Sequence, residues 1–169
     1  MKAQTLRRAL GDEAIGQEAR AQAGDHGALK LWLRLLSCST QIEQQVRGRL
    51  RERFATTLPR FDYLAQLERF PEGLRMKALS RYLMVSGGNV TLLTDQLEAE
   101  GFVERLADPE DRRSWMLRLT PAGRRAFETM AAEHEAWLRE LIGGFGPTAQ
   151  LYELLGQLRL HLAQGKENP

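Results

Sequence analysis

The sequence predicts a mainly α-helical protein with one small β-hairpin. Between residues 28 and 162, apolar residues recur every three or four positions along most of the chain, as the inward faces of helices do. Residues 102–119 instead contain two short strand-like runs around a turn. At 169 residues, 43% of them hydrophobic and 27% charged, the chain suits one modest domain or two small lobes that share a core.

The composition is that of a soluble globular protein. The chain has no run of eighteen apolar residues, so we expect no membrane span. The first residues, M-K-A-Q-T-L-R-R-A-L-G-D-E, lack the apolar stretch of a signal peptide. The single cysteine, Cys38, excludes an intrachain disulfide and fits the reducing cytoplasm, where we expect the protein to act. The formal net charge of +2 decides nothing about a polyanionic partner, because any basic surface would be local.

The first half of the chain is expected to form an N-terminal arm and two helices. Residues 1–27 contain four glycines and little periodic apolar content, which indicates a loosely ordered arm with room for a frayed helix. Residues 28–55 form one long helix, whose first half is apolar nearly all round, as in a helix that also serves an interface. Pro59 fits the first turn of the next helix, which ends at the Pro71-Glu72-Gly73 turn.

A helix-turn-helix followed by a hairpin is expected between residues 76 and 119. Helices over residues 76–83 and 87–100 are joined by a tight turn, and Gly101 closes the second one. Strands over residues 102–106 and 114–119 follow. In the second strand Trp115, Leu117 and Leu119 alternate with Ser114, Met116 and Arg118, as in a half-buried strand.

Two helices complete the chain. Thr120 is a suitable N-cap and Pro121 a suitable first residue for a helix that runs to the Gly143-Gly144 break. A last helix follows Pro147. We expect the long first helix and these terminal helices to pack together and against a second copy. The expected organisation is therefore an arm (1–27), a helical dimerisation lobe (28–57 and 121–164), a winged helix-turn-helix DNA-binding lobe (58–120) and a tail (165–169).

The second helix of the helix-turn-helix carries the candidate DNA-reading face. The hydroxyl of Ser86 can cap the helix, and Gly87 and Gly88 lack side chains, so a phosphate could approach the free N–H groups there. Asn89 is suited to a bidentate contact with adenine. The residues expected to face DNA are Ser86, Gly87, Gly88, Asn89, Thr91, Leu92 and Asp95. The alternative is a plain loop with solvated polar residues.

The tip of the hairpin adds a basic element. Arg112 and Arg113 stand at the turn of D-P-E-D-R-R, where they can reach a narrow minor groove, which attracts arginine. Asp111 would pair with Arg113 and hold that side chain in a fixed pose. The alternative is a hairpin tip with ordinary solvated charges.

Between Leu29 and Leu162 the chain resembles the MarR family of bacterial regulators. The most specific segments are V-S-G-G-N-V-T-L-L-T-D-Q-L-E-A-E-G-F-V-E-R, D-P-E-D-R-R and L-T-P-A-G-R. The resemblance implies a mainly α winged helix-turn-helix that dimerises through its terminal helices, with a ligand pocket between the two lobes. It also implies that Asp111 and Arg113 are the family's wing-tip pair. Two departures are Leu92, where many members have a basic residue, and Arg75-Met76, where a capping residue often starts the first reading helix.

Within that family, the segments L-W-L-R-L-L-S-C-S-T, T-T-L-P-R-F-D and M-V-S-G-G-N-V-T are similar to a subset that controls the breakdown of aromatic acids, some of which respond to aryl-coenzyme A thioesters. Aromatic rings could line such a pocket and arginines could meet a carboxylate or phosphates, although helical aromatics usually belong to the core. The candidate pocket residues are Trp32, Arg34, Cys38, Arg60, Phe61, Tyr63, His134 and Trp137.

The sequence therefore predicts a homodimeric, ligand-responsive repressor that binds a pseudo-palindromic operator and releases it on binding a small aromatic acid or its coenzyme A thioester. No enzyme motif is present, and no histidine has a second ligand at metal-binding spacing, so neither catalysis nor a cofactor is expected. Two alternatives remain: a helical dimerisation adaptor that binds no DNA, and a repressor that senses oxidants through Cys38.

Overall fold

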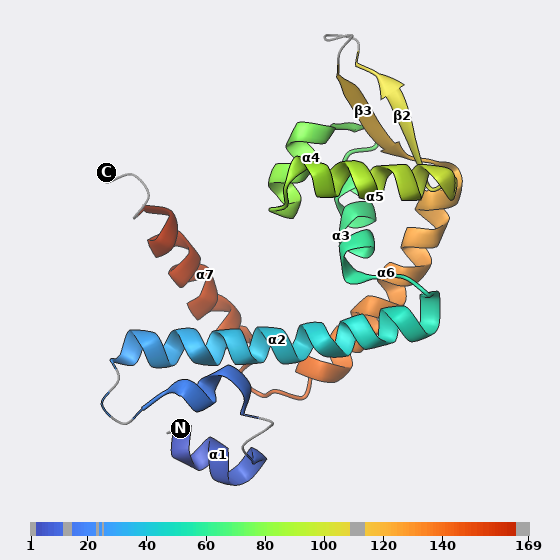
Figure 1. Cartoon of the computed structure of the whole chain (residues 1–169). Coiled ribbons are helices and arrows are strands. Elements are labelled where there is room, and N and C mark those ends of the chain that lie inside the picture. Colours follow the sequence, from blue (N-terminus) through green and yellow to red (C-terminus); the bar gives the residue numbers. More distant parts are fainter. Residues whose placement is uncertain (1–2, 12–14, 23, 25, 109–113, 165–169) are drawn as a thin grey trace. The chain divides into compact units, whose positions relative to one another are not determined.

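The computed structural model describes residues 3–11, 15–22, 24, 26–108 and 114–164. The described residues fall into two compact units, one within residues 1–127 and the other within residues 128–169. Figure 1 shows their helices and strands. Helices predominate, with one small sheet in the first unit, so the predicted fold class is confirmed. None of the described helices is long and apolar enough to cross a membrane.

The N-terminal residues differ from the loosely ordered arm that their glycines indicate. Helix α1 spans Ala3–Leu10 and the 3-10 helix η1 spans Gly16–Arg20. Ile15 and Glu18 are both 4% exposed, and η1 contacts the long helix α2. Sequence periodicity misses this contact because it rests on two buried side chains rather than on a repeating apolar face.

Helix α2 spans Gly27–Phe54, within one residue of the predicted limits. Its buried residues include Leu33, Val46 and Leu50, whereas Trp32 remains 57% exposed. The helix ends at Ala55, which takes a left-handed conformation with φ of 49° and donates its N–H to the carbonyls of the last turn. This turn leads directly into helix α3.

Three helices form the core of the helix-turn-helix: α3 (Leu58–Glu68), α4 (Met76–Leu83) and α5 (Gly87–Ala99). Their limits agree with the predicted ones, and α4 contacts both neighbours. Seven side chains from these helices are at most 1% exposed: Tyr63, Leu64, Leu67, Leu79, Val90, Thr94 and Leu97.

The sheet has three antiparallel strands in the order β1-β3-β2: β1 (Leu74–Arg75), β2 (Val103–Ala107) and β3 (Trp115–Leu119). The predicted hairpin β2–β3 is confirmed, with Val103 opposite Leu119 and Ala107 opposite Trp115. Strand β1 was not predicted, because two residues are too few for an alternating pattern. Leu117 and Leu119 are buried, whereas Trp115 on the same strand is 51% exposed and pairs with Ala107 near the far end of the hairpin.

The L-T-P-A-G segment joins the sheet to helix α6, which spans Pro121–Ile142. Thr120 Oγ1 accepts the N–H of Gly123 at 3.0 Å, so its predicted N-cap role is confirmed, and its hydroxyl donates to the Gly101 carbonyl at 2.6 Å. A Cβ on Gly123 would lie 1.9 Å from the carbonyl oxygen of Phe102, so only glycine fits where α6 passes the start of β2.

In the second unit, helix α7 spans Thr148–Gln164, as expected after Pro147. None of its residues, all of which the structure describes, is buried in the single chain. Its exposed large apolar residues are Leu151, Tyr152, Leu154, Leu155, Leu160 and Leu162. A helix with this much exposed apolar surface is a candidate for contact with another chain.

Candidate nucleic-acid interface

The turn between α4 and α5 sets the start of the candidate reading helix. Met84 ends α4 in a left-handed conformation with φ of 54° and donates its N–H to the Arg81 carbonyl at 3.2 Å. Its side chain is 91% exposed. Two residues later the backbone at Ser86 is extended, and α5 begins at Gly87. The chain therefore turns sharply enough to present the N-terminus of α5 to solvent.

The hydroxyl of Ser86 does not cap α5. Among the described residues it makes no side-chain hydrogen bond to the helix N-terminus, although Ser86 stands at the N-cap position. The predicted capping bond is thus wrong. Since this helix end is exposed, its first N–H groups are open to solvent or to an anion.

Glycine at the start of α5 is not required by the packing of the chain itself. A Cβ added to Gly87 or Gly88 would meet no described atom within 4 Å. Both φ angles lie outside the left-handed region, and both residues are helical. Because glycine is a poor helix former, a helix that begins with two of them without a steric reason suggests a requirement outside the protein.

The predicted DNA-facing residues that the structure describes all lie on the exposed side of α5 or at its start. Asn89 and Leu92 are exposed, the latter by 59%. The Thr91 hydroxyl donates to the Gly87 carbonyl at 3.1 Å, which leaves its methyl group as the part available to a partner. Asp111, Arg112 and Arg113 lie outside the described residues.

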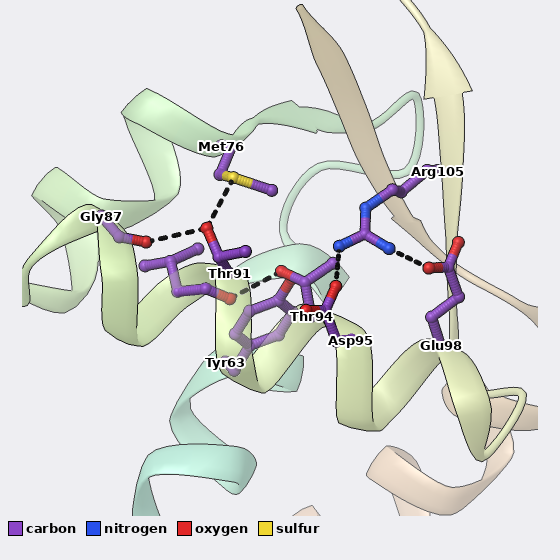
Figure 2. Close-up of polar contacts among 9 residues, drawn as sticks. Tyr63, Met76, Gly87, Thr91, Thr94, Asp95, Glu98 and Arg105 are labelled. Carbon is purple, nitrogen blue, oxygen red and sulfur yellow. Dashed lines mark hydrogen bonds and ion pairs between the residues drawn. The ribbon is translucent and has the colours of Figure 1, made fainter.

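Asp95 is held by a residue that the sequence did not single out. Arg105, on strand β2, donates to the carboxylates of both Asp95 and Glu98 on α5 (Figure 2). The hydrogen bond to Asp95 is the main reason why the pKa of Arg105 is raised. This bridge connects α5 to the hairpin, so Asp95 helps to orient α5 within the protein.

A buried hydrogen-bonded pair fixes α5 from the opposite side. Tyr63 on α3 and Thr94 on α5 are both fully buried, and their oxygens lie 2.5 Å apart. The Thr94 hydroxyl donates to the Val90 carbonyl at 2.7 Å, so the Tyr63 hydroxyl is the donor to Thr94 (Figure 2). Burial raises the pKa of Tyr63 to about 12. Tyr63, a candidate pocket residue from the sequence, is therefore part of the core.

An ion pair between Arg75 and Asp108 stabilises the base of the hairpin. Asp108, 3% exposed, accepts hydrogen bonds from Nε of Arg75 at 2.5 Å and from Nη2 at 3.2 Å. It is the last described residue before the tip, and its N–H donates to the Ser114 carbonyl. Asp108, expected to belong to the charged tip, is instead buried at the hairpin base. The sequence gives no signal for the pairing of Arg75 with Asp108, because Arg75 lies in a strand of only two residues and Asp108 is an acidic residue before a proline.

The remaining candidate pocket residues have varied surroundings. In the first unit Arg34 pairs with Glu18 and Arg60 with Glu100, Phe61 stacks 5.6 Å from Phe127, and Trp32 and Cys38 are exposed. In the second unit Trp137 is 7% exposed, and burial lowers the pKa of His134.

The first unit has an open hollow of about 390 Å³, and none of these candidate pocket residues lines it. Its lining residues are Pro71, Glu104, Arg118, Leu119, Pro121, Arg124 and Arg125. The described residues contain no group of three histidine, cysteine or acidic side chains that could hold a metal ion.

Known proteins share both sequence and fold with this chain. The family model described as MarR family matches residues 56–115. The transcriptional activatory protein BadR from Rhodopseudomonas palustris is 30% identical over 139 residues, which cover 80% of this chain and 79% of BadR. A MarR family transcriptional regulator from Silicibacter pomeroyi has a similar structure, with a TM-score of 0.69 and 28% identity over 85% of this chain and 99% of that one. The Streptomyces coelicolor regulator Sco3205, crystallised in complex with DNA, has the same fold, with a TM-score of 0.73 and 21% identity over 88% of this chain and 94% of that one.

Proposed function

Since this chain belongs to the MarR family and is a DNA-binding transcriptional regulator rather than an enzyme, we propose that it acts as a homodimeric repressor. In this proposal it binds a pseudo-palindromic operator and releases it when a small aromatic acid or the coenzyme A thioester of one binds. The name of the R. palustris relative describes an activator. A promoter-reporter assay with and without the protein therefore tests the direction of regulation.

The observation that carries the proposal is the open N-terminus of α5. Gly87 and Gly88 are exposed, and no atom of the described residues would exclude a larger side chain at either position. The helix dipole and the first N–H groups of α5 favour a phosphate there. Bridges to β2 and to α3 hold this helix in a defined orientation. A rigid helix with an open start suits insertion into a major groove.

Sequence preference would come from the exposed side chains that follow the glycines. Asn89 can make a bidentate contact with adenine, while the methyl groups of Thr91 and Leu92 can contact those of thymine. Arg112 and Arg113 would enter the adjacent minor groove and contribute salt-dependent affinity. We therefore expect Asn89 substitutions to relax preference between sites, and Arg113 substitutions to weaken binding to every site.

Dimerisation is supported by apolar surface at both ends of the chain. Helix α7 exposes a series of leucines, and the first half of α2 exposes Leu29, Leu31 and Trp32. Covering such surfaces with a second copy removes them from water. Two reading helices about 34 Å apart would then match half-sites roughly one helical turn apart.

The effector would act by favouring a dimer geometry that does not match this spacing, which requires that it bind the two states with different affinity. The aromatic class is supported by the resemblance of three segments to regulators of aromatic-acid breakdown. The exposed Cys38 favours one alternative, release by oxidation.

Fluorescence anisotropy tests the proposal directly. The purified chain is titrated against DNA from immediately upstream of its own gene at two salt concentrations, with and without benzoate, benzoyl-coenzyme A or hydrogen peroxide. We expect tight binding that weakens steeply with salt and is abolished by one of the two aromatic compounds. Release by peroxide alone would favour oxidant sensing through Cys38. Absence of binding to any genomic fragment would refute the proposal and favour a dimerisation adaptor.

A further inference from the structure

The short N-terminal helix η1 carries an acidic side chain into contact with α2. Glu18 is 4% exposed, an unusually low value for a carboxylate, and Ile15 beside it is equally buried. The guanidinium of Arg34 on α2 faces this carboxylate with two nitrogens. Its Nε donates to Oε2 at 3.0 Å, and its Nη2 donates to Oε1. Arginine commonly recognises a carboxylate through such a bidentate contact.

A second residue of α2 completes the contact. Ser37, one turn after Arg34, is 7% exposed. Its Oγ accepts the N–H of Glu18 at 2.9 Å, and its hydroxyl donates to the carbonyl of Ile15 at 3.3 Å. Gly16 adopts a left-handed conformation with φ of +57°, and this tight bend lets the backbone close over Ser37. Arg34 and Ser37 thus hold both the side chain and the backbone of the Glu18 segment, residues 15–20.

Two features distinguish this contact from an ordinary core ion pair. The Glu18 side chain is buried, with 5% of it exposed, whereas the Arg34 side chain is 36% exposed. The Arg34 side chain is therefore in contact with solvent beside the buried carboxylate. Replacing Glu18 by another carboxylate would also preserve the charge pairing, so it would avoid the large cost of leaving a buried charge alone.

We propose that Arg34 and Ser37 form a receptor site for the carboxylate of a small ligand, and that Glu18 is its internal occupant. The ligand replaces Glu18 on Arg34, and the Glu18 segment then leaves Ser37. This inference deepens the proposed effector response and rests on it for its regulatory meaning, but the exchange at Arg34 can be measured without DNA.

An internal competitor lowers the apparent affinity for the ligand. If Glu18 occupies the site about nine times in ten, the affinity falls about tenfold relative to an empty site. Glu18→Gln keeps the shape of the side chain and removes its charge, so it should raise the affinity for benzoate by about tenfold. Glu43→Gln is the matched control, because Glu43 pairs with Arg47 at 3.0 Å on the same helix but both side chains are about half exposed.

The test uses the full chain and isothermal titration with benzoate, acetate and inorganic phosphate. We expect benzoate to bind the wild type weakly, the Glu18→Gln variant about tenfold more tightly, and the Glu43→Gln variant like the wild type. Adding Arg34→Gln to Glu18→Gln should remove the gain. In wild type, hydrogen exchange of the Glu18 amide should become faster with benzoate, because its acceptor, Ser37 Oγ, is lost when the segment leaves. Circular dichroism confirms that each variant is folded.

Equal benzoate affinity of wild type and Glu18→Gln, or an unchanged exchange rate at Glu18, would make the pair purely structural and overturn the inference. Phosphate that binds as tightly as benzoate would overturn the carboxylate assignment. If benzoate displaces Glu18 but leaves DNA affinity unchanged, the receptor site stands and the proposed effector response fails.

Discussion

Substitution of Gly88 by alanine should affect stability and DNA binding in opposite directions. The added methyl group meets no described atom within 4 Å, and the residue is helical, so alanine should stabilise α5. The expected gain is up to about 1 kcal/mol per chain, and less near the helix end. On DNA, the same methyl group would stand where a phosphate approaches the helix N-terminus. Loss of one charge-assisted hydrogen bond costs about 1.5–3 kcal/mol.

Two half-sites would double that loss, to at least about 3 kcal/mol, which corresponds to roughly a hundredfold weaker binding. Urea unfolding measures the stability and fluorescence anisotropy measures the affinity. Gly48→Ala is the control, because Gly48 lies inside α2 and its added methyl group also meets no described atom within 4 Å. It should stabilise the protein without changing DNA affinity. A stabilised Gly88→Ala variant with wild-type DNA affinity would refute the close approach of α5 to the DNA backbone.

Three further predictions follow from the packing of α5 and from the titration of a histidine. Thr94→Val leaves the buried Tyr63 hydroxyl without its acceptor, so the free energy of unfolding in urea should fall by about 1–3 kcal/mol. The double variant with Tyr63→Phe should recover most of that loss, because the unpaired hydroxyl is then absent. Arg105→Ala should reduce the free energy of DNA binding more than the free energy of unfolding, because ion pairs with solvent-exposed partners contribute about 1 kcal/mol each whereas the bridge orients α5. A loss of unfolding free energy in urea that exceeds the loss of binding free energy measured by anisotropy would contradict this role. Burial lowers the pKa of His134, so the folded state resists protonation. Stability should therefore be lost as pH falls below the unfolded value of about 6.5, and His134→Gln should flatten that part of the stability curve.

The helices and the cap were predictable because their signals are local. Apolar spacing located α2 to α7 within a residue or two, and Thr120 followed by Pro121 marked the start of α6. The expected exposure of Asn89 and Leu92 is also confirmed, because the buried stripe of α5 leaves that side free. The family and the fold class follow from the same local motifs.

The tertiary contacts were not predictable from those patterns. Arg75 meets Asp108 across 33 positions, and Glu18 meets Arg34 across 16, so no periodic signal links them. Strand β1 pairs with β3 through Leu74 opposite Leu117 and Arg75 opposite Met116, which lie far apart in the sequence. Trp115 follows the alternation of a buried face yet is exposed, because burial depends on what covers the strand rather than on its pattern.

The sequence alone determined the order and limits of the helices, the hairpin and the residues at the open start of α5, since helix periods, caps and glycine preferences act over a few neighbouring residues. Only the tertiary structure decided that Arg105 and Thr94 hold α5, that Asp108 anchors the hairpin, and that Glu18 occupies Arg34. These contacts join residues between 7 and 33 positions apart, and their partners are brought together by burial of the shared core.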